Sequence, residues 1–201
     1  EAGCGSLELS EGPLVHRQPV ERHVVGADGS RYARLPATIR RTVQDATTHG
    51  YAGQVWEPAP YQWQHPFDPA TIETPYIYEC HVGMAGNEAR VHSHHEFADE
   101  VLPPVAAPGY NTVQLMAVAE HPYYGSFGYH VSSFFAPCSR FGTPEDLKHL
   151  VDTAHGLGLA VLMDVVHSHA IKNHREGLNN FDGSGGQYFH VGERGEHASW
   201  D

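Results

Sequence analysis

Asp164, His167 and His169 are the residues of this chain whose types and spacing most strongly suggest chemistry. They follow the run Leu-Ala-Val-Leu-Met at residues 159–163, which contains no polar side chain. A strand that is apolar on both faces is typical of a parallel sheet flanked by helices. In (β/α) barrels the carboxyl ends of such strands release their loops into a shared pocket, and active sites lie there. The three side chains therefore predict an enzyme site at the end of this strand.

The chain after residue 74 alternates between strand and helix patterns. Residues 77–82 predict a first strand, and residues 112–118 predict a second, buried strand before the one at 159–166. With one helix between each pair, the order is strand, helix, strand, helix, strand. This order is typical of the first three strands of a barrel, or of half of a doubly wound sheet.

Two helices are predicted between these strands. Ser93, with Glu96 three residues later, forms a capping box at the start of the first helix, and the Pro-Pro pair at 103–104 interrupts its apolar face. Thr143 is a good N-cap for the second helix, because a proline and two acidic residues follow it directly.

Residues 1–74 differ in character from the rest of the chain. Residues 20–25 and 31–35 flank a Gly-Ala-Asp-Gly segment, and an Asp-Gly pair between two strand patterns predicts a β-hairpin. Prolines and aromatic residues then mix between residues 56 and 69, which is typical of an irregular connector. We therefore expect one unit over residues 1–74 and an α/β unit over residues 75–201.

The segment Asp-Val-Val-His-Ser-His at residues 164–169 resembles the first signature region of the α-amylase superfamily, whose usual form is Asp-Val-Val-x-Asn-His. Other segments resemble one family of that superfamily, the 1,4-α-glucan branching enzymes. They occur in the same order as in that family, at residues 76–83, 109–116, 120–121, 126–130, 139–147, 177–183 and 188–190. The resemblance is close from about residue 76 to residue 201 and looser before it.

The resemblance implies an α/β fold, a partial (β/α)₈ TIM barrel with strands 1 to 3. Residues 1–74 would be the end of an N-terminal β-sandwich of the starch-binding type with its connector. Residues 75–201 would be the beginning of the catalytic barrel, cut before its fourth strand. Both ends of the chain look cut, because the first residue is not Met and the last follows a Trp directly.

The same resemblance implies the activity of a branching enzyme. Such an enzyme cleaves an α-1,4 link and transfers the cut chain to a 6-hydroxyl, forming an α-1,6 branch in starch or glycogen. The nucleophile and the acid/base of the superfamily follow later strands, so we expect them beyond Asp201, and we expect the isolated chain to be inactive. A debranching or trehalose-forming member of the superfamily is the alternative.

Five residues are expected to form a sugar-binding wall. Tyr129 resembles the family's tyrosine that stacks on the sugar, since its ring has an apolar face and a polar hydroxyl. His169 occupies the position whose imidazole hydrogen-bonds that sugar, and Asp164 is expected to orient the site. His130 extends the polar rim, and His121 follows the second strand, where pocket residues belong. The simpler interpretations are a core tyrosine for Tyr129 and a histidine that caps the strand end for His169, and Asp164 could instead be a catalytic acid.

A histidine-rich metal-binding module is the alternative from another class of protein. The chain has 17 histidines, and neutral imidazole is a common zinc ligand. His167 and His169 can share one face of an extended segment, and residues 92–95 hold a second group. However, no cysteine pair completes a closed site, and Ser168 replaces the Asn through which related amylases often bind calcium. We therefore expect no metal and no other cofactor.

The charge of the chain restricts its partners. With 12 basic and 24 acidic residues, the formal net charge is −12, which argues against binding to nucleic acid or an anionic membrane. A neutral α-glucan is compatible with this charge, and no signal for an oligomeric state is present. Three scattered cysteines and the lack of a long apolar run predict the cytoplasm, or a plastid if a transit peptide has been lost.

Overall fold

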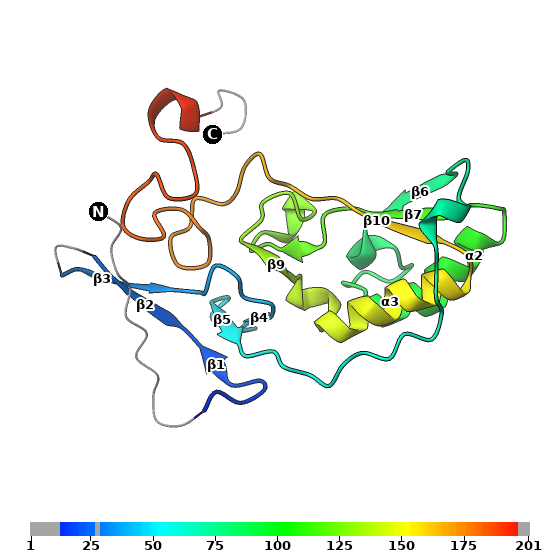
Figure 1. The fold of residues 1–201 in the computed structure, drawn as a ribbon, viewed down its shortest axis with the longest axis horizontal. Coiled ribbons are helices and arrows are strands. Elements are labelled where there is room, and N and C mark those ends of the chain that lie inside the picture. Colours follow the sequence, from blue (N-terminus) through cyan, green and yellow to red (C-terminus); the bar gives the residue numbers. More distant parts are fainter. Residues whose placement is uncertain (1–12, 27–28, 197–201) are drawn as a thin grey trace.

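The computed structural model describes residues 13–26 and 29–196, and Figure 1 shows their arrangement. A parallel sheet with its helices forms one end of the molecule, and small antiparallel sheets lie at the other (Figure 1). Cys4, residues 27–28 of the expected hairpin turn and the Trp200-Asp201 end of the resemblance lie outside the described residues. Within those residues, no helix has both the length and the apolar character that a membrane crossing requires.

A three-stranded parallel sheet forms the α/β part, with β7 in the middle. Its strands are β6 (Ile77–Cys80), β7 (Thr112–Leu115) and β10 (Ala160–Met163). Ile77 and Ala160 both pair with Thr112, so the three strands start level with one another. The three strands expected from the sequence are confirmed, each over a shorter range. Within this sheet, the order of the three strands in space is their order along the chain.

Helices occupy the two crossovers between these strands. The first is a continuous helical segment made of α1 (His94–Glu96), a π-helical turn (Phe97–Val101) and α2 (Leu102–Ala106). The second is α3 (Pro144–Gly156). Both expected capping boxes are present, one at Ser93 and one at Thr143.

The Pro-Pro pair at 103–104 does not end the first helical segment, contrary to the expectation that it interrupts the helix. The prolines stand in the first turn of α2 and have no N–H to donate to the preceding turn. The irregularity falls before them instead, in the wide turn Phe97–Val101.

The core lies between the helices and one face of the sheet. Val113 and Leu115 of β7 pack with Phe97, Leu102 and Leu150 from the helical segments, and none of the five has exposed surface. Burying a side chain of this size stabilises the fold by roughly 1.5–3 kcal/mol compared with leaving it in water. Because side chains alternate along a strand, the other residues of β7 face the opposite side of the sheet.

The remaining strands are short and antiparallel. One sheet has the order β1 (Pro19–Val20), β5 (Tyr51–Gln54), β4 (Thr42–Gln44). The expected hairpin is confirmed as β2 (Arg22–Val25) paired with β3 (Arg31–Arg34). A third sheet pairs β8 (Ala119–Glu120) with β9 (Ser133–Pro137). Between β5 and β6, the connector contains one short 3-10 turn (Pro69–Thr71) and no strand.

The chain after β10 is a long loop, as expected, and it contacts the hairpin. Residues 164–191 contain no helix or strand, and a 3-10 turn (Gly192–Gly195) follows. The Leu35 N–H donates to the Arg175 carbonyl at 3.1 Å, and the Arg34 guanidinium donates to the Asn180 carbonyl at 3.0 Å. In Figure 1 this orange and red segment lies beside β2 and β3.

The open edge of β10 generates a prediction about the isolated chain. β10 is an outer strand of the parallel sheet, and its residues Leu162 and Met163 are 44% and 50% exposed. Exposed apolar edge strands pair with other chains. We predict that the isolated chain of 201 residues self-associates and leaves amylose unbranched. Size-exclusion chromatography over a concentration series measures the association, and iodine staining of amylose measures branching.

Two lysine variants make this test specific. Leu162→Lys adds a charge to the edge strand and should reduce association, whereas Leu157→Lys, at an exposed position after α3, should not. A wild-type chain that is a monodisperse monomer and branches amylose would contradict the prediction.

Candidate active site

Hydrogen bonds join four side chains at the carboxyl ends of the parallel strands. Asp164 follows β10 directly, and its Oδ1 accepts a hydrogen bond from Gln114 Nε2 on β7 at 2.8 Å. The same nitrogen donates to Glu79 Oε1 on β6 at 3.3 Å. Asp164 Oδ2 accepts a hydrogen bond from the Tyr129 hydroxyl at 2.8 Å. We call Glu79, Gln114, Tyr129 and Asp164 the strand-end cluster.

The register of the sheet places the cluster. Glu79 pairs with Gln114, so their side chains emerge at the same level on adjacent strands. Both precede residues that point toward the core side, since Leu115 belongs to the buried cluster. The Asp164 N–H donates to the Leu115 carbonyl at 3.0 Å, which extends the β10 pairing by one residue. The cluster therefore lies on the sheet face opposite the helices.

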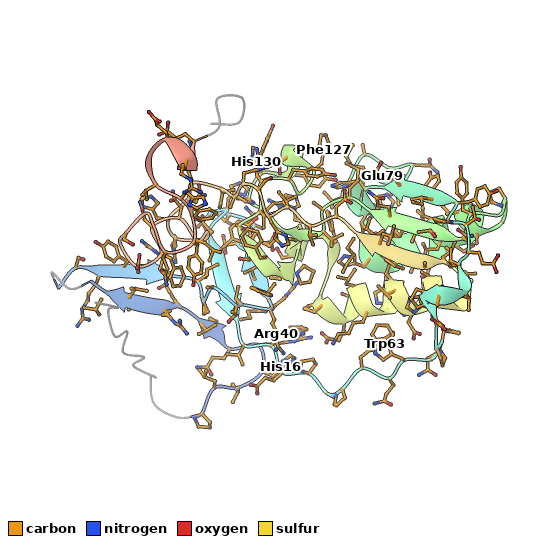
Figure 2. All side chains as sticks on the ribbon, turned by 45° about the horizontal axis from the view of Figure 1, so that its top comes forward. His16, Arg40, Trp63, Glu79, Phe127 and His130 are labelled. Carbon is orange, nitrogen blue, oxygen red and sulfur yellow. The ribbon has the colours of Figure 1, made fainter. Side chains whose placement is uncertain are left out.

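A left-handed turn brings Tyr129 to Asp164. Phe127 and Gly128 have φ of 56° and 92°, and a side chain on Gly128 would collide with the Ala117 carbonyl oxygen. Only glycine fits there, so the turn folds back closely over the chain that leaves β7. Figure 2 shows Phe127, His130 and Glu79 along the same side of the molecule.

Tyr129 is held in its neutral form. Burial, the hydrogen bond to Asp164 and the negative charges of Asp164 and Glu79 raise the pKa of Tyr129 to about 12. The phenol is therefore protonated near neutral pH and donates to Asp164. The cluster combines an aromatic ring with two acceptor carboxyl groups, a combination that can contact both the apolar face and the hydroxyl rim of a sugar.

His130 and His121 occupy different environments. His130 is exposed, with its ring 6.3 Å from that of Tyr123. His121 has no exposed surface; its Nδ1 donates to the Ala119 carbonyl at 2.9 Å, and its ring packs near Phe141. Burial lowers the pKa of His121, so its imidazole is neutral. These are the surroundings of a core residue, and a sugar contact by His121 stays a prediction.

His169 lies on a cavity of 520 Å³. The walls come from residues 168–172, from Asn179 and Gly185, and from the segment 189–196. None of the strand-end cluster lines this cavity. The His169 Nδ1 lies 3.0 Å from the Ser168 hydroxyl, and the exposed ring of His167 stacks at 6.1 Å on Phe134. The structure thus joins Tyr129 with Asp164 and places His169 on a separate opening.

Glu79 and Gln114 were not predicted as site residues. Glu79 lies inside a segment that the sequence predicts only as a strand, and Gln114 lies inside the second strand, which the sequence predicts to be buried. The available signal was a polar residue near the end of each strand, because polar side chains mark the face of a strand that the core does not cover.

A buried carboxyl group, Glu120, anchors the loop that leads to Tyr129. Its Oε2 accepts hydrogen bonds from the Thr42 hydroxyl at 2.7 Å and from the Ser139 N–H at 2.8 Å. Its Oε1 accepts from the His121 N–H at 3.2 Å. Thr42 belongs to β4, so this carboxyl group connects the N-terminal sheet to the start of the loop.

Two more side chains hold the first residues of the same loop. The His121 carbonyl accepts from the Tyr51 hydroxyl at 3.1 Å and from Arg140 Nη1 at 2.7 Å. The Pro122 carbonyl accepts from Arg140 Nη2 at 2.7 Å. The loop therefore begins at a point fixed by β5 and by the turn after β9.

The histidines of the dense group at 92–95 point to different partners. His94 is buried against Phe141, whereas His95 Nε2 lies 3.0 Å from Asp146 Oδ1. Across the described ranges, no group of three or more His, Cys, Asp or Glu side chains has an arrangement that could hold a metal ion. The absence of a metal cofactor stays a prediction.

Comparisons with known proteins agree with this arrangement. Residues 105–192 match the family described as Alpha amylase, catalytic domain. The crystal structure of a Salmonella typhimurium protein described as an alpha amylase aligns with a TM-score of 0.60 and 28% identity, over 76% of this chain and 25% of that one. The chain thus carries part of an α-amylase-type catalytic domain.

Curated relatives narrow the assignment. The 1,4-alpha-glucan-branching enzyme of Solanum tuberosum is 52% identical over 96% of this chain, and that of Yarrowia lipolytica is 49% identical over 94%. The Saccharomyces cerevisiae enzyme of the same name is 47% identical over 94%. The chain belongs to the 1,4-α-glucan-branching enzyme family. It spans 24%, 28% and 28% of the lengths of these three relatives.

The Glu120 anchor generates a prediction about stability. Thr42→Val removes the hydroxyl that donates to Glu120 and keeps the shape of the side chain. Glu120 Oε2 keeps the Ser139 N–H as its second donor, so the variant loses one hydrogen bond, which costs about 0.5–1.5 kcal/mol. We expect the melting temperature of the complete protein to fall by about 1 °C, because the unfolding entropy grows with chain length, and differential scanning calorimetry measures the shift. Thr74→Val is the matched control, because Thr74 is exposed. Identical melting temperatures for both variants and the wild type would refute the anchoring role.

Proposed function

We propose that the complete protein carrying this chain is a 1,4-α-glucan-branching enzyme. It cleaves an α-1,4 link of a donor glucan and transfers the cut chain to a 6-hydroxyl of an acceptor. The observation that carries the proposal is the strand-end cluster, in which a neutral tyrosine and two carboxyl groups lie at the strand ends of a chain from this family. The alignment covers about a quarter of each relative, so the proposal concerns the whole protein.

Each site residue has a role in this proposal. Tyr129 stacks on the sugar at the reaction centre, and Asp164 fixes its ring through the 2.8 Å hydrogen bond. His169 hydrogen-bonds the same sugar from the loop after β10, which brings the 520 Å³ cavity into the substrate path. His130 contacts the glucan at the exposed rim. His121 contributes through the loop that it begins.

We further propose that β6, β7 and β10 are the first three strands of a (β/α)₈ barrel. The match of residues 105–192 to the alpha amylase catalytic domain and the adjacency of consecutive strands support this architecture. Residues 1–74 would then be the end of an N-terminal β-sandwich with its connector, and residues 75–201 the beginning of the barrel. The short antiparallel sheets before β6 support that division.

The catalytic carboxylates belong to the part of the barrel that follows. Retaining α-glucan enzymes use a nucleophile and an acid/base about 5–5.5 Å apart. In the proposed barrel the nucleophile and the acid/base follow later strands, beyond Asp201. The strand-end cluster forms one wall of the pocket into which these two carboxyl groups point. The nucleophile forms a covalent glucosyl intermediate, and the 6-hydroxyl of the acceptor displaces it.

The substrate and compartment complete the proposal. A neutral α-glucan such as amylose, amylopectin or glycogen suits a protein with a net charge of −12, which disfavours nucleic acid and anionic membranes. We place the protein in the cytoplasm, or in a plastid if a transit peptide precedes this chain. The rice relative is named as chloroplastic/amyloplastic.

Incubation of the complete protein with amylose tests the reaction. Branching shortens the linear segments, so iodine absorbance should fall while the number of reducing ends stays constant, because each cleavage is followed by transfer. Isoamylase treatment should then release short linear chains. If one new reducing end appears for each link that is cleaved, the reaction is hydrolysis, and branching is refuted.

The pocket wall generates a kinetic prediction. If Tyr129 and His169 contact the sugar more strongly in the transition state, Tyr129→Ala and His169→Ala should lower kcat more than they raise KM. A transition-state hydrogen bond is worth roughly 2–4 kcal/mol, so His169→Ala should lower kcat by about 30- to 1,000-fold. Tyr129→Phe should have a smaller effect, because it keeps the ring and loses only the bond to Asp164.

The control for these variants is His95→Ala. His95 is exposed and pairs with Asp146 at the start of α3, so its loss should leave kcat nearly unchanged. His94 is fully buried and is therefore unsuitable as a control. Normally folded Tyr129→Ala and His169→Ala proteins with wild-type kcat would remove both residues from the sugar-binding wall.

A further inference from the structure

One buried carboxyl group holds the connector against α3. Asp152 on α3 is only 4% exposed, and its oxygens accept hydrogen bonds from three donors of the connector. These are the Gln64 N–H at 3.0 Å, the His65 N–H at 2.9 Å and the Tyr61 hydroxyl at 3.3 Å. Three donors within five consecutive residues share one carboxyl group, so the shape of residues 61–65 is fixed before any ligand arrives.

Four rings follow one another along this fixed segment and the end of α3. Trp63 lies 4.9 Å from Tyr61, edge to face, and 6.4 Å from His155 on α3. His155 in turn stacks on Phe67 at 4.6 Å with an interplanar angle of 8°. We call Tyr61, Trp63, Phe67 and His155 the connector platform. Trp63 is 51% exposed, which leaves a large part of the indole open to solvent.

Two amide side chains flank Trp63 in the chain, and His65, which pairs with the buried Asp152 at 3.4 Å, follows them. Gln62 and Gln64, the two neighbours of Trp63 in the chain, are exposed. Their side-chain nitrogens donate to backbone carbonyls at 3.1 Å and 2.8 Å, which orients both amides. Within the described ranges, their side-chain oxygens have no hydrogen-bond donor. An exposed indole with two exposed amides next to it in the chain suits a neutral sugar, whose C–H face stacks on a ring and whose hydroxyls need acceptors.

The connector platform is remote from the strand-end cluster. Asp152 and His155 lie in the last turns of α3, which ends just before β10 begins, whereas Asp164 follows the end of β10. Figure 2 shows Trp63 on the opposite side of α3 from Glu79, Phe127 and His130. A ligand on Trp63 therefore does not enter the reaction centre, although a long polymer could contact both places.

We propose that the connector platform is a second, non-catalytic binding site for α-1,4-glucan, in which glucose units stack on Trp63 and hydrogen-bond to Gln62 and Gln64. The nature of the sugar rests on the proposed function, whereas the site itself rests on the four rings and on Asp152. Its occupant is a distant stretch of a long glucan. The platform thus raises affinity for polymers and leaves reactions of short chains unchanged.

Native electrophoresis of the complete protein through gels that contain increasing amylopectin measures this affinity directly. Trp63→Ala removes the stacking surface and should raise the apparent Kd by about 5- to 10-fold. Gln64→Ala keeps the backbone bond to Asp152 and should raise the apparent Kd by about 2- to 3-fold. Phe135→Ala is the matched control, because Phe135 is an exposed ring on β9 outside the platform. With short amylose as substrate, kcat should be unchanged in all three variants.

The outcomes separate this inference from the proposed function. If amylopectin slows Trp63→Ala and Gln64→Ala in the gel as strongly as it slows the wild type, the platform is overturned, whether or not the protein branches amylose. If amylopectin slows the variants less than the wild type and the wild type forms no branches, the platform is supported and the branching reaction is refuted. If Trp63→Ala does not fold, Gln64→Ala alone tests the platform, and wild-type mobility of Gln64→Ala in the amylopectin gels would overturn it. A change of oligomeric state with unchanged retardation would assign the patch to contacts between two copies and overturn the inference.

Discussion

The burial of Glu120 is the constraint on which the arrangement of this chain depends. A carboxyl group that leaves water loses several kcal/mol of solvation unless hydrogen-bond donors replace it. Here the donors come from distant parts of the chain, since Thr42 on β4 and Ser139 after β9 both reach one oxygen. The N-terminal sheet, the end of β8 and the turn after β9 must therefore come together for any of them to be stable. This interaction joins the N-terminal sheet to the segment between β7 and α3.

The same constraint reaches the candidate active site through the backbone. The loop that carries Tyr129 begins at Glu120, and Tyr51 and Arg140 hold its first carbonyl groups. From there the left-handed residues Phe127 and Gly128 turn the chain back, so that the Tyr129 hydroxyl reaches Asp164. A residue of the N-terminal sheet thus helps to place a side chain at the strand ends. Asp152 has the equivalent role on the outer side, where it holds the connector.

The two faces of the parallel sheet have different roles, since one packs in the core and the other holds the strand-end cluster. Val113 and Leu115 of β7 point into the core, where burial of apolar surface stabilises the fold. Gln114 lies between them and points to the other face, where it bridges Glu79 and Asp164. A single strand of four residues therefore supports both the core and the polar cluster, because successive side chains alternate between faces.

The sequence by itself determined the features whose signals are local. The two capping boxes, the three parallel strands and the hairpin depend on neighbouring residues. The motif at residues 164–169 indicated the α-amylase superfamily. The tertiary structure decided which polar residues meet. The pairing of Gln114 with Glu79 and Asp164 follows from register, and the burial of His121 follows from packing on Phe141. Glu120 meets a hydroxyl 78 residues away. Such contacts depend on how distant segments pack, and no local pattern of residues encodes that packing.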